Sequence, residues 1–269
     1  MNAGPQPFFL KADPGQRFCL LHEPANNAPR RGAVVYVHPF AEELNKTRRM
    51  AALQARALSE RGFTVLQIDL YGCGDSSGDF VDPRWSDWRK DVGSACDHVL
   101  VHAPRPLILW GLRLGALLAV DYAAAASVRP DALLLWQPVL NGEAHLRQFF
   151  RQQSAARLLT PGLDKATAEQ ATEVGGYALS PGLQSDVRAI DMHALAPGCP
   201  VFWIEQAGPS SIDLPPASND LIQRWNGTGV RVNTAVAAGP QFWATSEISE
   251  SPSFLAATGN FLAQTGLSQ

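Results

Sequence analysis

Segments typical of buried strands alternate with helix-like segments along most of the chain, and this alternation restricts the fold to one built on a largely parallel sheet. Single helices between strands imply right-handed crossover connections. Strands are predicted over residues 8–11, 17–21, 33–37, 64–70, 107–110, 132–136, 201–204 and 230–236. Helices are predicted over residues 48–61, 85–102, 114–126 and 253–264.

The order of these elements predicts the architecture more closely. The first two strands flank Asp13-Pro14-Gly15, a strong turn signal that predicts an antiparallel hairpin. A polar, helix-favouring insert of about residues 141–192 follows the sixth strand. This pattern predicts a single α/β-hydrolase domain over residues 1–269, with a mostly parallel central sheet flanked by helices, an N-terminal hairpin and a small helical lid. The alternative, a Rossmann sheet, requires a GxGxxG turn after the first parallel strand, where His38-Pro39-Phe40-Ala41 stands instead.

Composition excludes several classes of protein. The chain of 269 residues is 46% hydrophobic and 17% charged, as a packed globular protein is. Its net charge of -3 gives no argument for binding nucleic acid. The apolar stretch 107–126 contains Arg113 and Asp121, so a buried strand and helix explain it better than a transmembrane segment. Without an export signal at the start, we expect a soluble, cytoplasmic protein.

Neither metal nor cofactor is expected. The four cysteines form no CxxC pair, which argues against a zinc site or a disulfide framework. His98 and His102 have the i, i+4 spacing of metal ligands on a helix. With no third ligand close in sequence, they are better explained as a helix face.

The segment Trp110–Ala116 (WGLRLGA) has the strand-turn-helix context of a nucleophile elbow, G-x-S-x-G. The two glycines let the backbone turn sharply around the central residue. That residue is Arg113 instead of serine. A guanidinium is always protonated and cannot attack a carbonyl, so the chain lacks the usual nucleophile.

The histidine of a Ser-His-Asp triad is also missing. In this fold the catalytic histidine follows the last strand. The last histidine of the chain, His193, precedes the strand at 201–204, and the segment after the final strand reads AAGPQFW (237–243). Glu205 and Asp213 are candidates for the acid, but there is no base for them to orient.

Two segments offer substitute catalytic groups. Cys73 and Ser76 lie in the segment YGCGDSSG (71–78), which is more typical of a glycine-rich turn. His38 follows the first parallel strand, where hydrolases form the oxyanion hole. Fixing that loop by hydrogen bonding is a better explanation of His38 than general-base catalysis.

The segment 40–50 carries five charges and Asn45 between a buried strand and a helix, and we expect a loop with the helix starting at Asn45 or Thr47. This loop and Arg113 should be neighbours at adjacent strand ends. Because a cation at a helix N-terminus is disfavoured by about 0.3–1 kcal/mol, Arg113 needs an anionic partner. Glu42 and Glu43 are both candidates.

Several motifs resemble those of the exosortase A system-associated hydrolase family, type 2. They are HPFAEELNKTRRM (38–50), IDLYGCGDSSGDF (68–80), LWGLRLGALLA (109–119), LLLWQPVLNGE (134–143), GGYALSP (175–181) and GPQFW (239–243). The resemblance implies a bacterial protein of exopolysaccharide and PEP-CTERM protein-sorting loci, with an exosortase-pathway protein as a partner. The elbow arginine is part of this resemblance, and the resemblance assigns no catalytic residue.

Two hypotheses of function remain. The first is a non-catalytic member, a pseudoenzyme, that binds a small acyl or anionic ligand or a protein partner. The second is an acyl ester or thioester hydrolase in which Glu43 or Asp75 acts as base and the Phe40 and Leu114 amides bind the oxyanion. The candidate ligand-pocket residues all belong to segments expected at the carboxyl ends of the strands: His38, Phe40, Glu42, Glu43, Asn45, Tyr71, Arg113, Leu114, Gln137, Glu205, Gln241 and Trp243.

Overall fold

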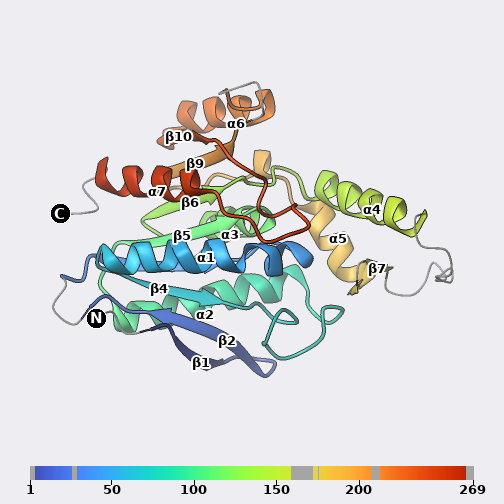
Figure 1. Cartoon of the computed structure of the whole chain (residues 1–269), viewed down its shortest axis with the longest axis horizontal. Helices are drawn as coiled ribbons and strands as arrows, with labels where there is room; N and C mark the ends of the chain where they lie inside the picture. The colour runs from blue at the N-terminus through green and yellow to red at the C-terminus, as the bar shows by residue number, and fades with distance from the viewer. Residues whose placement is uncertain (1–3, 26–28, 159–171, 175, 208–212, 265–269) are drawn as a thin grey trace.

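A computed structural model describes residues 4–25, 29–158, 172–174, 176–207 and 213–264, and an eight-stranded sheet forms its centre (Figure 1). The strand order is β1-β2-β4-β3-β5-β6-β9-β10. The strands are β1 (Gln6–Lys11), β2 (Gln16–His22), β3 (Gly32–Val37), β4 (Phe63–Ile68), β5 (Leu107–Leu112), β6 (Ala132–Trp136), β9 (Val201–Gln206) and β10 (Val232–Ala237). The β1/β2 and β2/β4 pairs are antiparallel and all other pairs of this sheet are parallel, which confirms the predicted hairpin and mostly parallel sheet.

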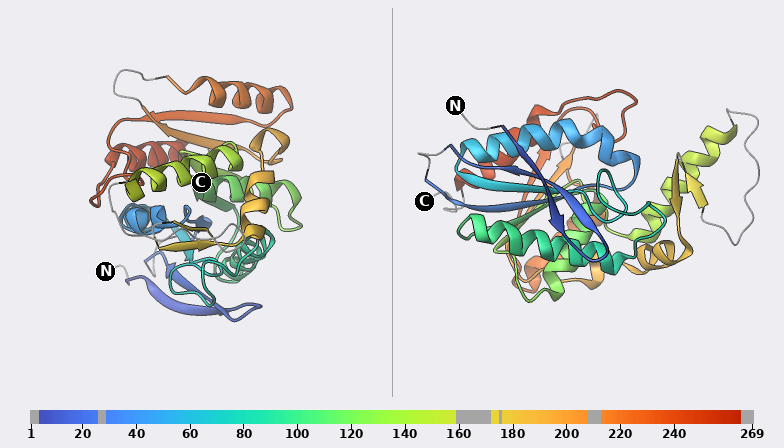
Figure 2. Two further views of the ribbon diagram at one scale, coloured as in Figure 1. Left: turned by 90° about the vertical axis from the view of Figure 1, so that its right-hand side faces the viewer. Right: turned by 90° about the horizontal axis from the view of Figure 1, so that it is seen from below.

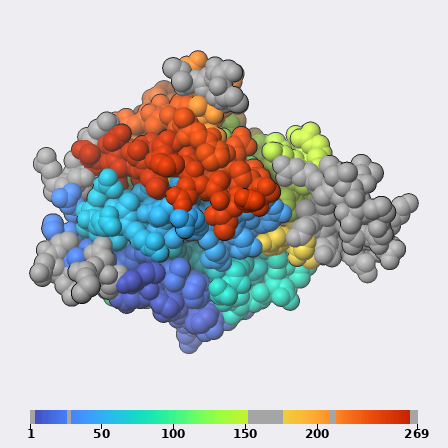
Figure 3. All heavy atoms as spheres, viewed as in Figure 1, coloured from blue at the N-terminus to red at the C-terminus, as the bar shows by residue number. Residues whose placement is uncertain are grey.

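Helices cover both faces of the sheet. They are α1 (Glu42–Glu60), α2 (Trp85–His102), α3 (Leu114–Ala125), α6 (Pro216–Gly227) and α7 (Pro252–Gln264). Because side chains alternate along a strand, Val35 and Leu109 pack with α2 and α3, whereas Val34 and Trp110 pack with α1 and α7. Figures 1 and 3 show α7 and the segment before it, in red, lying along α1.

The segment after β3 differs from the prediction. α1 begins at Glu42, so most of the expected loop 40–50 is helical. A sharp turn at Ala41 (φ 49°) starts the helix early. Glu42 and Glu43 then occupy the first turn, where negative charge is favourable. Thr47, a poor helix former, bonds through its hydroxyl to the Glu43 carbonyl oxygen at 2.8 Å, as helical threonines commonly do.

A further helix that was not predicted, α6, connects β9 to β10. Pro216 is its first residue, a position that proline favours. Leu221, Ile222 and Trp225 supply its buried face at helical spacing. These two signals were present in the sequence.

The insert after β6 lies beyond the carboxyl ends of the strands (Figure 2). Its described elements are α4 (Gly142–Leu158), β7 (Thr172–Val174), β8 (Tyr177–Leu179), α5 (Pro181–Ala189) and the 3₁₀ turn η1 (Met192–Ala194). The predicted helical insert therefore also contains a short hairpin, while its residues 159–171 and 175 lie outside the described ranges. Arg84 of the main body fixes α5 by two hydrogen bonds of 2.7 Å to Asp186.

Candidate functional site

Three neighbouring parallel strands are each followed by a non-glycine residue with a positive φ. These residues are Ala41 (49°) after β3, Arg113 (56°) after β5 and Gln137 (43°) after β6. Such conformations cost on the order of 1–3 kcal/mol each and are maintained only where the surroundings enforce them. They mark one edge of the sheet as the candidate site.

The turn at Arg113 has the geometry that the sequence predicts for an elbow. Its backbone N–H donates to the Trp136 carbonyl oxygen at 3.0 Å, and its carbonyl oxygen accepts from Ala116 N–H at 3.0 Å. Gly115 lies so close to β3 that a Cβ atom would be 2.3 Å from the Val37 and His38 carbonyl oxygens. Glycine is therefore required for α3 to start against the end of β3.

Arg113 forms the expected ion pair, and its partner is Glu43. Arg113 Nε donates to Glu43 Oε1 at 3.2 Å, and the two side chains are only 14% and 19% exposed. Burial raises the pKa of Glu43, while the neighbouring Arg113 opposes this shift. Glu42, the other candidate, instead pairs with Lys46 on the exposed side of α1.

The loop after β10 brings an aromatic ring to the elbow in place of a histidine. The Trp243 ring lies over the Arg113 guanidinium, with 5.6 Å between Cζ and the ring centroid. Trp243 is buried, whereas Gln241, another candidate from this loop, is exposed. The structure thus brings Arg113, Glu43 and Trp243 together and does not bring Gln241 into the buried site.

His145 of α4 reaches the same place and was not among the predicted site residues. Its ring lies 5.6 Å from that of Phe40, and among the described residues its buried Nε2 has no hydrogen-bond partner. Burial, aided by the charge of Arg113, lowers the pKa of His145 to about 3, so the ring is neutral at pH 7. The spacing of His145 and Phe149, which also contacts Phe40, was a signal that one face of this helix is buried.

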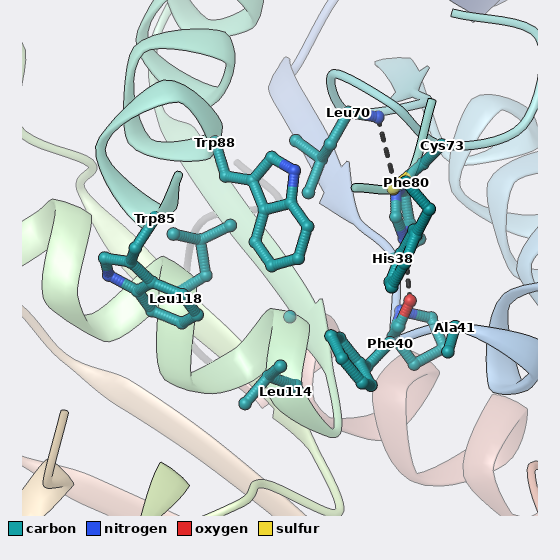
Figure 4. A pocket seen from close by; sticks show the side chains of 12 residues that line it. His38, Phe40, Ala41, Leu70, Cys73, Phe80, Trp85, Trp88, Leu114 and Leu118 are labelled. Atoms are coloured by element: carbon teal, nitrogen blue, oxygen red, sulfur yellow. Dashed lines mark hydrogen bonds between the residues drawn. The ribbon is translucent and has the colours of Figure 1, made fainter. Parts of the chain in front are cut away.

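His38 serves the loop, as predicted. Its Nδ1 bonds to the Pro39 carbonyl oxygen at 2.7 Å, and its Nε2 accepts from Leu70 N–H at 3.1 Å (Figure 4). Burial lowers the pKa of His38, so it is a neutral imidazole with both nitrogens engaged. It fixes the loop that carries Phe40.

Glu205 lies at the position of the acid of a triad, and its carboxyl also holds a neighbouring side chain of the sheet in place. Glu205 Oε1 accepts a 2.6 Å hydrogen bond from Trp203 Nε1, and burial raises the pKa of Glu205. Gln137 Oε1 accepts from Gln206 N–H at 2.7 Å and so links the ends of β6 and β9. Asp213, the other acid candidate, is exposed.

The glycine-rich loop after β4 is a structural turn, as the sequence favours. Ser76 Oγ donates to the Asp69 carbonyl oxygen at 2.5 Å and accepts from Phe18 N–H at 2.9 Å. Burial raises the pKa of the Cys73 thiol, which keeps it protonated. Tyr71, a pocket candidate, instead packs its ring over Arg17, with 4.6 Å between Cζ and the ring centroid.

An apolar pocket lies beside the elbow (Figure 4). Leu114 and Leu118 of α3 face Phe40 and Phe80 across it, and two tryptophans of α2 close one side. Its volume of about 10 Å³ corresponds to roughly one water molecule. The complete lining consists of His38, Pro39, Phe40, Ala41, Leu70, Cys73, Phe80, Trp85, Trp88, Leu114, Gly115 and Leu118.

Residues 28–193 match the family model described as "Serine aminopeptidase, S33". The chain belongs to this family. Its fold is the α/β-hydrolase fold predicted from the order of the strands and helices. No curated protein matches the chain.

Three solved structures show how widely the fold of this serine aminopeptidase family member is shared. Est1E from Butyrivibrio proteoclasticus, solved with ferulic acid bound, is 17% identical with a TM-score of 0.66, and the match covers 96% of this chain and 99% of Est1E. A thermostable carboxyl esterase from Bacillus coagulans, in complex with glycerol, is 15% identical with a TM-score of 0.67, covering 99% and 100% of the two chains. XC6422 from Xanthomonas campestris, a serine hydrolase without a lid, is 15% identical with a TM-score of 0.61, covering 98% and 94%.

A metal site and a membrane-spanning helix are not found in the part of the chain that the structure describes. No group of three or more histidine, cysteine or acidic residues is arranged there to hold a metal ion. The His98 and His102 rings lie 4.8 Å apart between centroids at a tilt of 42°, and the Phe8 ring stacks on His98. None of the helices in the described ranges combines the length and apolarity needed to span a bilayer.

Proposed function

We propose that this member of the serine aminopeptidase family is a non-catalytic protein that binds a ligand carrying an acyl group or a carboxylate at the elbow. The proposal rests on one observation above all. The nucleophile position holds Arg113, which is paired with Glu43 and covered by Trp243. The elbow has no serine, and the chain after β10 carries no histidine.

The chemistry of the elbow suits an oxygen-rich anionic or polar group. A guanidinium recognises carboxylates by charge-assisted hydrogen bonds. The Leu114 amide opens α3, a position where a helix offers its N–H no acceptor of its own, and so it favours the same groups. Aromatic and aliphatic side chains line the adjoining pocket, which suits an acyl chain. That pocket now holds only about one water molecule. In this proposal the acyl chain of the ligand enters as the side chains around Phe40 move apart.

We also propose that the protein has a partner protein from the exosortase pathway. The resemblance of the motifs around Glu43 and Arg113 to the exosortase-associated family supports this. In this view the insert over 141–192 acts as a lid, because α4 places His145 and Phe149 against Phe40. Co-purification of the tagged chain with an exosortase-pathway protein from its native host tests the link, and failure to recover any such protein would contradict it.

Direct binding measurements test the elbow. Octanoate and ferulate, titrated calorimetrically into the whole protein, are expected to bind, and Arg113→Ala is expected to abolish binding. Arg224→Ala removes an exposed arginine on α6 and serves as the matched control. A panel of p-nitrophenyl esters and a fluorophosphonate probe should show neither turnover nor labelling. Binding of octanoate that survives Arg113→Ala would contradict the proposal.

A second function is favoured by one specific feature of Glu43. Burial raises its pKa, as it does in many general bases, and its Oε2 is buried with no hydrogen-bond partner among the described residues. Glu43 could then activate water against an acyl ester or thioester held by the Phe40 and Leu114 amides. This function requires measurable hydrolysis in the wild type that is lost in Glu43→Gln and retained in Glu42→Gln.

A further inference from the structure

A second, polar cavity lies next to the elbow pocket. Its volume is about 580 Å³, within the range of small-molecule sites. It opens between α1, the loop after β4 and the short hairpin of the insert. The residues that line it are Ala41, Leu44, Asn45, Arg48, Gly72, Cys73, Gly74, Asp75, Phe80 and Tyr177. We call it the polar groove.

The polar side chains of the groove are held in place by bonds between separate elements. Asn45 Nδ2 of α1 donates to the Tyr177 hydroxyl of β8 at 3.3 Å. Arg48 Nη2 donates to Asp69 Oδ2 at 3.0 Å, and this oxygen also accepts from the backbone N–H of Asp75 at 3.1 Å. The wall of the groove is therefore organised before a ligand arrives.

Gly74 shows how tightly the loop is fitted against this wall. Its φ is 55°, and a Cβ atom there would lie 2.0 Å from Asp69 Oδ2 and 2.7 Å from Arg48 Nη2. Only glycine lets the backbone cover the Arg48–Asp69 pair so closely. The loop residue that follows, Asp75, is thereby fixed at the groove.

The charges of the groove disfavour an anionic ligand. Arg48 is its one charged donor; burial acts to lower the pKa of Arg48, but the hydrogen bond to Asp69 and the charges of Asp69 and Asp75 more than offset this and raise it. One cation beside two carboxylates leaves no positive excess for a phosphate or a carboxylate. Asn45 and Tyr177 each offer a donor and an acceptor, which is the pattern that hydroxyl groups satisfy.

The groove and the apolar pocket share a wall. Ala41, Cys73 and Phe80 line both cavities, and the Phe80 ring meets the Tyr177 ring edge-on at 5.0 Å between centroids. From this juxtaposition we infer that the polar groove binds the neutral, hydroxyl-rich head of an amphiphilic ligand whose apolar part enters the elbow pocket. This inference rests on the proposed binding function and names the class of its ligand as an acylated or alkylated polyol.

Three probes, each with an eight-carbon chain, test it. Octyl glucoside carries a neutral polyhydroxyl head, octyl phosphate an anionic head, and octanoate only the carboxylate expected at Arg113. All are titrated calorimetrically into the whole protein below their micelle-forming concentrations. Octyl glucoside is expected to bind more tightly than octyl phosphate.

Variants of the groove give the expected pattern. Asp75→Ala and Tyr177→Phe should each weaken octyl glucoside binding by about tenfold, roughly the loss of one good hydrogen bond. The same variants should leave octanoate binding within about twofold of the wild type, since the elbow is untouched. Asp97→Ala, which removes an exposed carboxylate on α2, is the matched control. Circular dichroism and thermal unfolding confirm that each variant is folded.

The outcomes separate this inference from the proposed function. Failure of octyl glucoside to bind, or affinity unchanged in both groove variants, would overturn the inference. The inference would also be overturned if octyl phosphate bound more tightly than octyl glucoside and lost affinity in the same two variants. The groove would then prefer an anionic head. Octanoate binding that is absent or indifferent to Arg113→Ala would overturn the proposed function instead, whatever octyl glucoside does.

Discussion

The indole ring of Trp243 lies 5.6 Å from the guanidinium carbon of Arg113, and with it the loop after the last strand covers the elbow. Such a contact contributes about 0.5–2 kcal/mol, more when the cation is shielded from water. The arginine replaces a nucleophile and the indole occupies the loop that would carry the general base. The two replacements therefore stabilise each other, instead of being two independent losses.

This relationship predicts that a serine at the elbow is not sufficient for catalysis. Arg113→Ser should show no ester hydrolysis above the wild type, because Trp243 cannot take the proton of the hydroxyl. The measurement is turnover of p-nitrophenyl acetate, with Arg113→Ala as the control for changes in background. Labelling of Arg113→Ser by a fluorophosphonate would show that another base serves the elbow.

Glu43 is expected to compete with the ligand for Arg113. Glu43→Gln removes the charge of the competitor but keeps a hydrogen-bonding oxygen, so octanoate should bind about three- to tenfold more tightly. Glu42→Gln, one residue earlier and paired with Lys46 outside the site, should change the affinity by less than about twofold. Equal effects of the two substitutions would point to general surface charge instead of the ion pair.

His145 should make stability depend on pH on the acid side. Its pKa is about 3 in the folded protein and 6.5 as a free side chain, so between these values the unfolded chain binds one more proton. The free energy of unfolding should therefore rise with pH through this window, by at most about 1.4 kcal/mol per unit from this residue. Its contribution is complete above pH 6.5 and is lost on acidification. In urea unfolding curves from pH 4 to 7.5, His145→Gln should reduce the slope, with the exposed His102→Gln as the control.

A buried ion pair supports the loop that reaches the groove. Arg17 Nε lies 2.8 Å from Asp91 Oδ1, and the other oxygen of Asp91 accepts from Tyr71 N–H at 2.7 Å. Asp91→Ala should cost about 3–5 kcal/mol of unfolding free energy, because it leaves a buried cation without its partner. Adding Arg17→Met should recover part of that loss in chemical denaturation. A double variant that is less stable than Asp91→Ala would contradict this account.

Gly115 should be intolerant of any side chain. Gly115→Ala places a methyl group 2.3 Å from two carbonyl oxygens of the β3 end, so α3 must move. We expect a loss of more than about 2 kcal/mol in unfolding free energy, in the range of overpacked cores. Gly227→Ala, at a position with open space around it, is the matched control and should be nearly neutral.

Much of this molecule follows from local patterns in the sequence. The β-branched and aliphatic runs of β3 and β5 and the alanine-rich α3 specify buried elements by composition alone. The two glycines around Arg113 specify the turn between β5 and α3, and the structure supplies the reason in the close approach to Val37 and His38. Even the need of Arg113 for an acidic partner follows from its place at a helix start.

The remaining features depend on contacts between distant segments. The choice of Glu43 over Glu42 depends on the phase of α1, which is set by the turn at Ala41. His145 reaches the elbow only because the insert folds back over the strand ends, and no local pattern gives that direction. The polar groove unites Asn45, Asp75 and Tyr177 from three separate segments, so it exists only in the folded chain.

The backbone of the elbow is held by three main-chain hydrogen bonds, from Arg113 to Trp136 and to Arg113 from Ala116 and Val139. None of them uses the Arg113 side chain, so the turn should persist when that side chain is exchanged. Arg113→Cys would then offer an attachment point for an environment-sensitive dye, held at a fixed angle over the mouth of the pocket. Because the backbone keeps its turn, such a reporter would sense the apolar pocket from a defined position, independently of the carboxylate binding proposed for Arg113.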